Sequence, residues 1–314
     1  MKNVLVVGAS GFLGSQIVKL LSPKKYRVFA LDISKPTKLA KDVTYFQKSI
    51  KDFFIEKTYL SLKIDIIVNT AASLPYKGKD QDFYTNNVQA ATLICQLYEV
   101  LNYPKILHVS SSGVYGLPND IPINSKTKFN PMDAYAKSKI EAENILKVRV
   151  PKKNLTIIRP RTIVGPGRTG IFDILLLLIR YKVPIPLPQG GSQILQFVHV
   201  TDLSRLIVYL MENSISGVWG AGGPNPKPLK YELTRLSKSI GVNATFVPIN
   251  KSLFVWLGKV LIFLKVIKFT KWHFVGFTNS AYYDPNWTPD GFKYYFESGE
   301  ALSQLAEGFN GEFF

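Results

Sequence analysis

The sequence predicts an α/β protein with a doubly wound parallel sheet, followed by a smaller C-terminal lobe. Three observations lead to this prediction. A glycine-rich turn joins a buried apolar run to an amphipathic segment, an acid ends the next apolar run, and short β-branched runs alternate with longer helical patterns to about residue 165. Strands that alternate with helices form parallel sheets, which bind ligands at the carboxyl ends of their strands.

The glycine-rich turn follows the apolar run that begins at residue 4 and has the spacing Gly8-x-x-Gly11-x-x-Gly14. Gly8 permits a tight turn, Gly11 lets an anion approach the backbone, and Gly14 lets the helix pack close to the sheet. The amides of the first helical turn then face a phosphate group. The spacing therefore predicts a pyrophosphate-binding turn.

The second predicted strand covers residues 26–32 and ends in Asp32, which lies 18 residues after Gly14. A carboxylate at this place accepts hydrogen bonds from both ribose hydroxyls of a dinucleotide. Asp32 favours NAD, because the 2′-phosphate of NADP would meet like charge there. Lys35 and Lys38 follow closely enough to leave NADP as an alternative.

The other regular elements of the first half follow from the periodicity of apolar residues. Strands are predicted at residues 64–69, 105–111 and 155–159, and helices at 81–101 and 133–147. This order implies a Rossmann-type sheet with helices on its faces.

The composition of the sequence changes beyond Gly165, where prolines become frequent and the regular alternation of predicted strands and helices ends. We therefore divide the chain into a Rossmann-type dinucleotide-binding domain, residues 1–165, and a region that is mainly a substrate-binding lobe, residues 166–314. The two regions are expected to interleave at their boundary. One open alternative is that residues 194–212 pack on the main sheet again.

The composition indicates how large a core the chain can bury and in which compartment it works. A chain of 314 residues with 46% apolar content can bury a large core. The single cysteine, Cys95, excludes a disulfide framework and favours a reducing compartment. We therefore expect a cytoplasmic protein, with membrane association left open. No cysteine, histidine or acidic grouping has metal-ligand spacing, so no metal is expected.

The net charge of +17 favours anionic ligands. The basic residues are scattered and accompany no nucleic-acid-binding motif, which argues against a nucleic-acid partner. We expect instead a small-molecule substrate that is phosphorylated or nucleotide-linked.

Residues 251–271 contain five lysines and no acid among many apolar residues. Lys259, Lys265 and Lys268 argue against a membrane span, because each costs about 3 kcal/mol at a bilayer centre. Two alternatives remain, an interfacial helix on anionic lipid and a helix that closes over a substrate pocket.

A serine, a tyrosine and a lysine form the candidate catalytic group. Ser111 follows a predicted strand, and Tyr135 comes 24 residues later, four residues before Lys139. On a helix the last two share a face, so the lysine ammonium can stabilise a tyrosinate that otherwise forms only near pH 10. Such a phenol exchanges a proton with a substrate oxygen while hydride moves to or from nicotinamide. Ser111 would fix that oxygen.

With these motifs the chain resembles the extended branch of the short-chain dehydrogenase/reductase superfamily, within the NAD-dependent epimerase/dehydratase family that includes UDP-galactose 4-epimerase. The resemblance covers most of the chain. It rests on Gly-Ala-Ser-Gly-Phe-Leu-Gly at 8–14, Asp32, Asn69-Thr-Ala-Ala72, Asn87-Val88, Ser-Ser-Ser-Gly-Val-Tyr-Gly at 110–116, Tyr135 with Lys139, Arg159-Pro160, Val-Gly-Pro-Gly at 164–167 and Phe-Val-His-Val-Thr-Asp at 197–202.

The resemblance implies a role for each matching residue. Tyr135 is the acid and base, Lys139 also holds the nicotinamide ribose, and Ser111 binds the reacting oxygen. The expected cofactor-binding residues are Gly8, Ser10, Gly11, Phe12, Leu13, Gly14, Asp32, Ser49, Ile50, Ala71, Ala72, Asn87, Tyr135 and Lys139. The expected substrate-binding residues are Ser111, Ser112, Tyr135, Arg161, Thr162 and Arg168.

Departures from the family pattern after Ser111 narrow the reaction. The 4,6-dehydratases carry an Asp-Glu pair where this chain has Ser112 and Gly113, so dehydration is disfavoured. The epimerase-reductases that make GDP-fucose carry a cysteine in place of Gly113, so that double epimerisation is disfavoured as well. Oxidation, reduction and 4-epimerisation remain.

Departures in the second lobe concern the substrate. Leu195 stands where related enzymes of nucleotide sugars often carry an arginine that grips the pyrophosphate, and Thr162 replaces an asparagine that often touches the nucleotide. Arg161, Arg168 and Lys182 are candidates for the missing positive charge.

Two further residues are assigned structural roles. His108 lies inside an apolar strand, which predicts a hydrogen-bonded core residue rather than a catalyst. Asp202 is predicted to cap a helix that starts near Leu203.

The predicted function is an NAD-dependent enzyme that acts on a sugar nucleotide by hydride transfer, with 4-epimerisation as the leading reaction. One alternative is an NAD(P)-dependent ketoreductase or dehydrogenase of a nucleotide sugar or of a lipid-linked carbonyl substrate. Another is a non-catalytic NAD-binding sensor or scaffold. A homodimer is left open.

Overall fold

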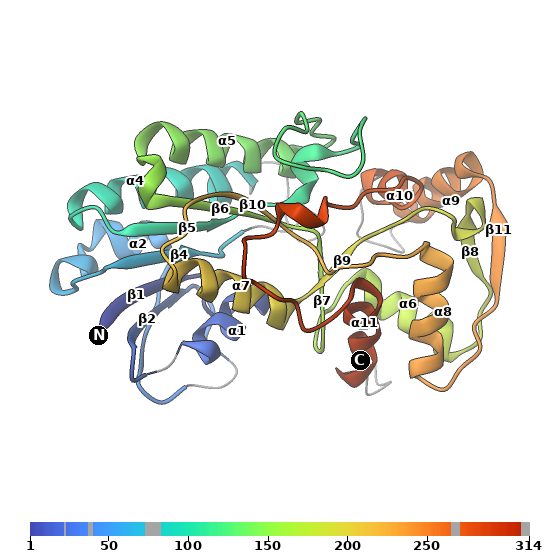
Figure 1. Ribbon diagram of the computed structural model, residues 1–314, viewed down its shortest axis with the longest axis horizontal. Coiled ribbons are helices and arrows are strands. Elements are labelled where there is room, and N and C mark those ends of the chain that lie inside the picture. Colours follow the sequence, from blue (N-terminus) through green and yellow to red (C-terminus); the bar gives the residue numbers. More distant parts are fainter. Residues whose placement is uncertain (22, 37–39, 73–82, 265–270, 309–314) are drawn as a thin grey trace.

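A parallel sheet of seven strands forms the centre of the larger lobe, and a smaller lobe lies beside it (Figure 1). The computed structural model describes residues 1–21, 23–36, 40–72, 83–264 and 271–308. In sheet order the strands are β10 (Gly217–Ala221), β6 (Leu155–Pro160), β5 (Lys105–Val109), β4 (Ile66–Asn69), β1 (Lys2–Val7), β2 (Tyr26–Asp32) and β3 (Val43–Gln47). The predicted α/β fold with a doubly wound sheet is confirmed.

Helices cover both faces of this sheet. One face carries α1 (Phe12–Leu20) and α7 (Val200–Glu212); the other carries α2 (Ile50–Ile55), α4 (Ala90–Val100) and α5 (Ala134–Arg149). In β1, Val4 and Val6 belong to the first of these cores, whereas Leu5 and Val7 belong to the second. Successive side chains of a strand point to opposite faces, so a strand covered on both sides is apolar throughout.

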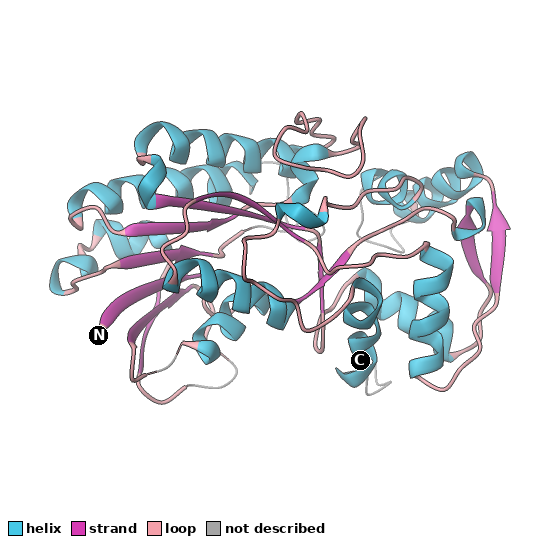
Figure 2. Cartoon of the chain, in the orientation of Figure 1, coloured by secondary structure: helices cyan, strands magenta, loops and turns pink. Residues whose placement is uncertain are grey.

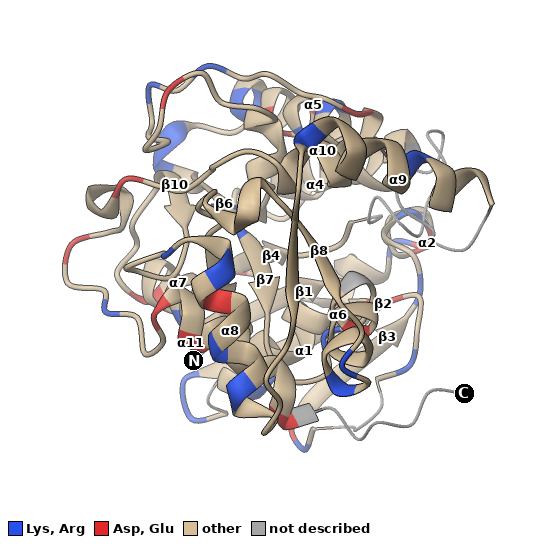
Figure 3. Cartoon of the chain, turned by 90° about the vertical axis from the view of Figure 1, so that its right-hand side faces the viewer, with Lys and Arg blue, Asp and Glu red and all other residues tan. Residues whose placement is uncertain are grey.

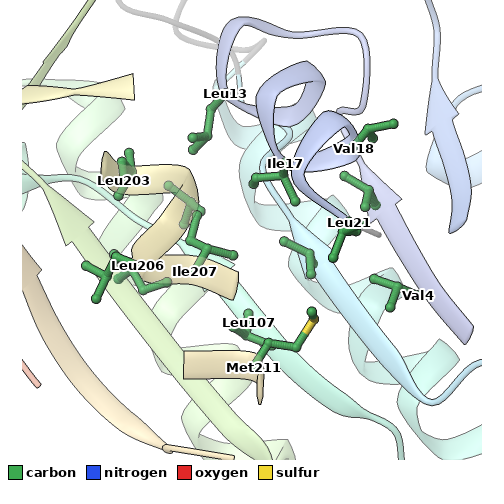
Figure 4. Packing of buried hydrophobic residues seen from close by; sticks show 14 of the residues in the cluster. Val4, Leu13, Ile17, Val18, Leu21, Leu107, Leu203, Leu206, Ile207 and Met211 are labelled. Carbon is green, nitrogen blue, oxygen red and sulfur yellow. The ribbon is translucent and has the colours of Figure 1, made fainter. Parts of the chain in front are cut away.

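The first core joins α1 to α7, which is distant from it in sequence. Figure 4 shows Leu13 and Ile17 on the side of α1 that faces Leu203 and Ile207 of α7. All four side chains are buried. This packing ties a helix that lies beyond residue 165 in the sequence to the face of the main sheet.

The smaller lobe consists of short strands and helices (Figure 2). Its strands form two parallel pairs: β7 (Thr162–Val164) with β9 (Phe197–His199), and β8 (Ile185–Pro188) with β11 (Phe246–Ile249). Its helices are α6 (Ile171–Arg180), α8 (Leu229–Ser239), α9 (Lys251–Phe263), α10 (Lys271–Phe277) and α11 (Ser298–Ser303). A separate apolar core, which includes Leu176, Leu187 and Leu236, lies between these elements.

Short helical segments complete the secondary structure. A π-helical segment, Tyr84–Gln89, precedes α4. The 3₁₀ segments are Thr58–Ser61, Ser112–Tyr115, Lys152–Asn154, Gln189–Gly191, Pro285–Trp287 and Gln304–Gly308.

The predicted elements of the first half are present with adjusted bounds. The strand expected at 105–111 ends at Val109, and the helix expected at 133–147 runs two residues further, to Arg149. Residues 81 and 82 of the helix expected at 81–101 lie outside the described residues. The sequence analysis did not predict β3 and α2. The division at residue 165 stays a prediction. Two elements that follow this residue in the sequence, α7 and β10, pack on the larger lobe.

The prediction that Asp202 caps a helix is wrong. Helix α7 begins at Val200, and its N-cap is His199, whose Nδ1 accepts a hydrogen bond from the N–H of Thr201. Asp202 is fully buried in the first turn, and its carboxylate accepts hydrogen bonds from the N–H groups of Tyr295 and Phe296. The acid therefore ties the C-terminal segment to α7.

Replacement of this buried carboxylate tests its structural role. We expect Asp202→Asn to lower the free energy of unfolding by about 2–3 kcal/mol, because the amide replaces charge-assisted hydrogen bonds and turns a donor toward N–H groups. Urea denaturation measures the change. The exposed Asp120→Asn serves as the control, and an equal effect of both substitutions would contradict the proposed tie.

Candidate active site

A cavity of about 480 Å³ opens at the carboxyl ends of the central strands. From the larger lobe it is lined by the glycine turn, by the ends of β4 and β5 and by the start of α5. From the smaller lobe it is lined by the segment after β6 and by α10. The lining residues that the site depends on are Gly8, Gly11, Phe12, Leu13, Gly14, Thr70, Ala72, Ser111, Ser112, Gly113, Tyr135, Lys139, Arg161, Thr162, Arg168, Leu195, Trp272, His273, Val275 and Phe277.

The three glycines of the turn have different surroundings. A Cβ on Gly8 would lie 2.6 Å from the nitrogen of Ala71, and one on Gly14 would lie 2.1 Å from the carbonyl oxygen of Gly8. Gly8 also has a φ of +81°. A Cβ on Gly11 would meet only the carbonyl oxygen of Gly8, at 3.2 Å. Gly8 and Gly14 are thus required by the fold, whereas Gly11 faces the cavity.

The N-terminus of α1 points its first amides toward this cavity. No side chain caps the helix, and its first turn holds no acid. The positive end of the helix dipole and the unpaired N–H groups favour an anion at this place. The turn therefore fits a pyrophosphate, as its spacing predicts.

Asp32 is held rigidly at the end of β2. One carboxylate oxygen accepts a hydrogen bond from the N–H of Ser10, and the other accepts one from the N–H of Ser34, both at 2.9 Å. Each oxygen keeps a lone pair for a ribose hydroxyl. Lys35 is exposed nearby, and Lys38 lies outside the described residues.

Other residues expected to bind the cofactor are not part of the described cavity wall. Ser49 caps α2 by accepting a hydrogen bond from the N–H of Asp52, and Ile50 is the first residue of that helix. Asn87 is buried and donates a hydrogen bond to Ser138 of α5. The N–H of Ala71 is bound by the side chain of Asn69. Contact of these residues with a cofactor stays a prediction.

The candidate catalytic side chains come together at the end of β5. Ser111 follows the strand and accepts a hydrogen bond from the N–H of Gly113, while Tyr135 and Lys139 come from the first turns of α5. A Cβ on Gly113 would lie 3.2 Å from Ser111 Oγ and 4.0 Å from Tyr135 Cε1. The hydroxyl and the phenol ring thus flank this glycine, and all three residues line the cavity.

Lys139 is buried, with 1% of its surface exposed. Its Nζ donates a hydrogen bond of 2.8 Å to the carbonyl oxygen of Val109, at the end of β5. Burial lowers the pKa of this lysine to about 8, and the carboxylate of Glu143 acts in the opposite direction. An ammonium at this place can stabilise negative charge on the neighbouring phenol.

A network of buried charged side chains lies next to this lysine and was not predicted from the sequence. Glu143 binds Arg159 through two hydrogen bonds and Lys147 through one. Burial raises the pKa of Glu143, but its hydrogen bonds and charge interaction with Arg159 outweigh that effect and hold the pKa at about 2. The available signal was the i, i+4 spacing of Lys139 and Glu143 on α5.

His108 has the predicted structural role. It is 1% exposed, and its Nδ1 lies 3.0 Å from the side-chain nitrogen of Asn69. Burial lowers the pKa of its imidazole to about 3, so the ring is neutral at physiological pH. The prediction of a hydrogen-bonded core residue is confirmed.

Two arginines bring positive charge to the cavity wall. The guanidinium of Arg161 lies 5.9 Å from the ring centre of Tyr283, and that of Arg168 lies 5.4 Å from the ring centre of Phe12. Within the described part of the chain, the Nε atoms of both arginines are buried and make no hydrogen bond. Lys182 is exposed and is not part of the described cavity wall.

Helix α10 forms an aromatic and apolar wall of the cavity. Trp272, Val275 and Phe277 contribute to this wall, together with His273. Leu195, at the position where related enzymes often carry an arginine, lines the cavity as well and packs in the apolar core of the smaller lobe. The sequence offered only the apolar character of this region as a signal.

A family model matches residues 4–221 and carries the description NAD dependent epimerase/dehydratase family. The chain belongs to this family. The match covers the glycine turn, Ser111, Tyr135, Lys139 and the first strands of the smaller lobe, so it agrees with the resemblance inferred from the motifs. Members of the family are NAD-dependent enzymes.

Relatives in curated collections are distant. The chain is 30% identical over 210 residues to an uncharacterized protein, y4nG, of Sinorhizobium fredii, a match that covers 66% of this chain. The chain spans about half (53%) of that relative's length. It is 26% identical over 251 residues to a UDP-glucose 4-epimerase of Caenorhabditis elegans, with 65% of this chain and 71% of the relative covered.

Solved structures show the same fold along nearly the whole chain. The UDP-Glc/GlcNAc 4-epimerase of Campylobacter jejuni matches with a TM-score of 0.77 at 17% identity, covering 98% of each chain. The UDP-glucuronic acid 4-epimerase of Bacillus cereus, in complex with UDP-glucuronic acid and NAD, matches with a TM-score of 0.76 at 20% identity, covering 98% of this chain and 99% of that one.

The surroundings of the glycines predict different effects of two substitutions. Gly11→Val should remove NAD binding, because the new side chain points into the cavity, and should lower the free energy of unfolding by only about 1 kcal/mol, because its Cβ approaches one carbonyl oxygen and valine is a poor N-cap residue. Gly14→Ala should instead destabilise the fold by about 3 kcal/mol, because its Cβ would overlap the backbone of Gly8. Calorimetric NAD titration and urea denaturation measure both. Unchanged NAD affinity in folded Gly11→Val would place the pyrophosphate elsewhere.

Proposed function

We propose that this protein is an NAD-dependent 4-epimerase of a nucleotide-linked sugar. One observation carries the proposal: Ser111, Tyr135 and Lys139 line the same cavity as the glycine turn at the start of α1. A hydride acceptor bound at that turn and a proton-transfer group would therefore face one substrate. A protein that only binds NAD, such as a sensor or scaffold, has no need of the proton-transfer group.

The residues present fit NAD. The space beside Gly11 and the uncapped N-terminus of α1 suit its pyrophosphate, and the fixed carboxylate of Asp32 suits the hydroxyls of its adenine ribose. Lys139 would hold the nicotinamide ribose. When bound, NAD accepts a hydride from the sugar carbon and returns it.

The protein's own residues move the proton and orient the sugar. Tyr135, as phenolate, takes the proton of the sugar hydroxyl while the C–H hydrogen leaves as hydride, and it returns that proton when the hydride comes back to the other face of the ring. Ser111 donates a hydrogen bond to the reacting oxygen. The ammonium of Lys139 lowers the proton affinity of the phenol by its charge.

The residues after Ser111 argue against two other reactions of the family, dehydration and double epimerisation. Ser112 and Gly113 supply no carboxylate or thiol for elimination of water or for deprotonation of a sugar carbon. The relatives and solved structures named above include 4-epimerases of UDP-sugars. Arg161 and Arg168 are the candidates for contact with the substrate's phosphates.

A second candidate is reduction of a lipid-linked carbonyl substrate. It is supported by Leu195, at the position where related enzymes often carry an arginine, and by the apolar wall that Trp272, Val275 and Phe277 form.

A panel of UDP-hexoses and UDP-hexuronic acids, analysed for C4 epimers by chromatography and NMR, separates the candidates. Interconversion of one C4 pair supports the epimerase. Conversion of a lipid-linked ketone alone, with consumption of NADH or NADPH, would replace it.

Loss of the phenol hydroxyl tests the chemical step. Tyr135→Phe should retain NAD binding and folding but lower turnover at least ~10²-fold, the usual scale for a positioned acid and base. Tyr231→Phe, at an exposed tyrosine, is the matched control. Near-normal turnover in Tyr135→Phe would remove this residue from the mechanism and favour a sensor or scaffold.

The buried lysine predicts a pH dependence of cofactor binding. Because burial lowers the pKa of Lys139 to about 8, the ammonium is charged below that pH and loses its proton above it. NAD affinity should therefore be constant at lower pH and fall by up to about tenfold per pH unit above 8, as long as the bound cofactor favours the charged form. Lys139→Met should bind NAD weakly at every pH, whereas exposed Lys137→Met should keep the wild-type profile. A flat wild-type profile would show that the ammonium does not contact the cofactor.

A further inference from the structure

Helix α9 presents an apolar face that the described part of the chain leaves uncovered. Trp256 is 58% exposed, Phe263 84%, Leu264 61% and Leu253 41%. At 100° per residue these four side chains fall within one side of the helix. Single exposed apolar residues are common on protein surfaces, but a contiguous group on one helix marks an interaction site.

The opposite side of α9 is fixed to the protein. Gly258 is buried against Phe274 of α10, where a Cβ would lie 2.4 Å from the ring, and the ring centres of Phe254 and Phe274 are 5.7 Å apart. Helix α10 in turn lines the cavity. The exposed face of α9 therefore points away from the active site and is not explained by it.

The charge around this face is of one sign. Residues 251–271 contain five lysines and no acid. Figure 3 shows α9 at the rim of the molecule beside α10, with blue segments and no red one. Lys259 is exposed at the edge of the apolar face, and no carboxylate of the described chain lies within salt-bridge distance of it. Lys251 lies on the opposite side of the helix, where its Nζ donates a hydrogen bond of 3.4 Å to Asn279 Oδ1. Lys265 and Lys268 lie outside the described residues.

We propose that α9 lies in the plane of an anionic lipid bilayer surface, with Trp256, Phe263 and Leu264 inserted below the headgroups and Lys259, at the edge of this face, bound to anionic lipid. An apolar face flanked by lysines, with an aromatic ring at the boundary, is the pattern of an interfacial helix. None of the described helices is both long and apolar enough to cross a bilayer.

A second copy of this chain fits the same face less well. In a two-fold dimer each surface meets itself, so the positive charge of Lys259 on both copies would be brought to one interface, with no acid in the segment to compensate it. An anionic bilayer covers the apolar side chains and neutralises this charge at once. This inference does not depend on which sugar the enzyme acts on.

Vesicle flotation with the full chain tests the proposal. Wild type should float with phosphatidylcholine vesicles that contain about one third phosphatidylglycerol, bind pure phosphatidylcholine at least ~10-fold more weakly, and lose binding as salt is raised. Trp256→Ser/Phe263→Ser should abolish flotation, and Leu60→Ser/Val148→Ser, which removes exposed apolar residues from the other lobe, should not. Circular dichroism and NAD titration establish that each variant is folded.

The contribution of charge to lipid binding is tested by a second variant with a matched control. Lys259→Gln should weaken binding roughly fivefold, the effect of one lysine at an anionic surface, whereas Lys152→Gln removes the same charge elsewhere and should leave binding unchanged. Equal flotation of wild type with neutral and anionic vesicles would overturn the proposal, as would equal effects of the two lysine substitutions. A wild-type dimer that becomes monomeric in Trp256→Ser/Phe263→Ser, without lipid binding, would assign the face to a second copy.

Discussion

The buried ammonium of Lys139 is the constraint on which the candidate catalytic end of the larger lobe depends. An ion removed from water is tolerated only where hydrogen bonds and opposite charge replace its hydration. Here the carbonyl oxygen of Val109 accepts its hydrogen bond, and Glu143, one turn further along α5, supplies the opposite charge. The helix that carries Tyr135 is thereby fixed against the end of β5, beside the serine that follows this strand.

The supporting charges extend this constraint across the molecule. Glu143 is held by Arg159 of β6, which also donates a hydrogen bond to the hydroxyl of Tyr115. The carbonyl oxygen of Arg159 accepts a hydrogen bond of 2.8 Å from the hydroxyl of Tyr283, in the C-terminal segment. Buried ion pairs contribute little net stability, but removal of one partner leaves an uncompensated charge. We therefore interpret the network as a device that sets the position of α5 rather than as a source of stability.

The sequence predicted those features whose causes are local. The glycine spacing determines the turn after β1, and the four-residue separation of Tyr135 and Lys139 places both on one side of α5. The edge strand at residues 43–47 escaped prediction because both its sides are partly exposed, which leaves no continuous apolar run. Asp202 was assigned wrongly because its partner, the N–H of Tyr295, lies 93 residues away. The wall that α10 adds to the cavity also depends on tertiary folding, which no local period encodes.

The central claim is that one active site removes a hydrogen from the sugar and returns the same hydrogen to the opposite face. Its most direct test uses UDP-hexoses deuterated at C4, incubated with purified protein and no cofactor beyond what copurifies. If the same hydrogen returns to the sugar, mass spectrometry and NMR will find the C4 epimer with its deuterium retained and no NADH in solution. A product that has exchanged its deuterium for solvent hydrogen, or a keto sugar formed in step with free NADH, would contradict this claim.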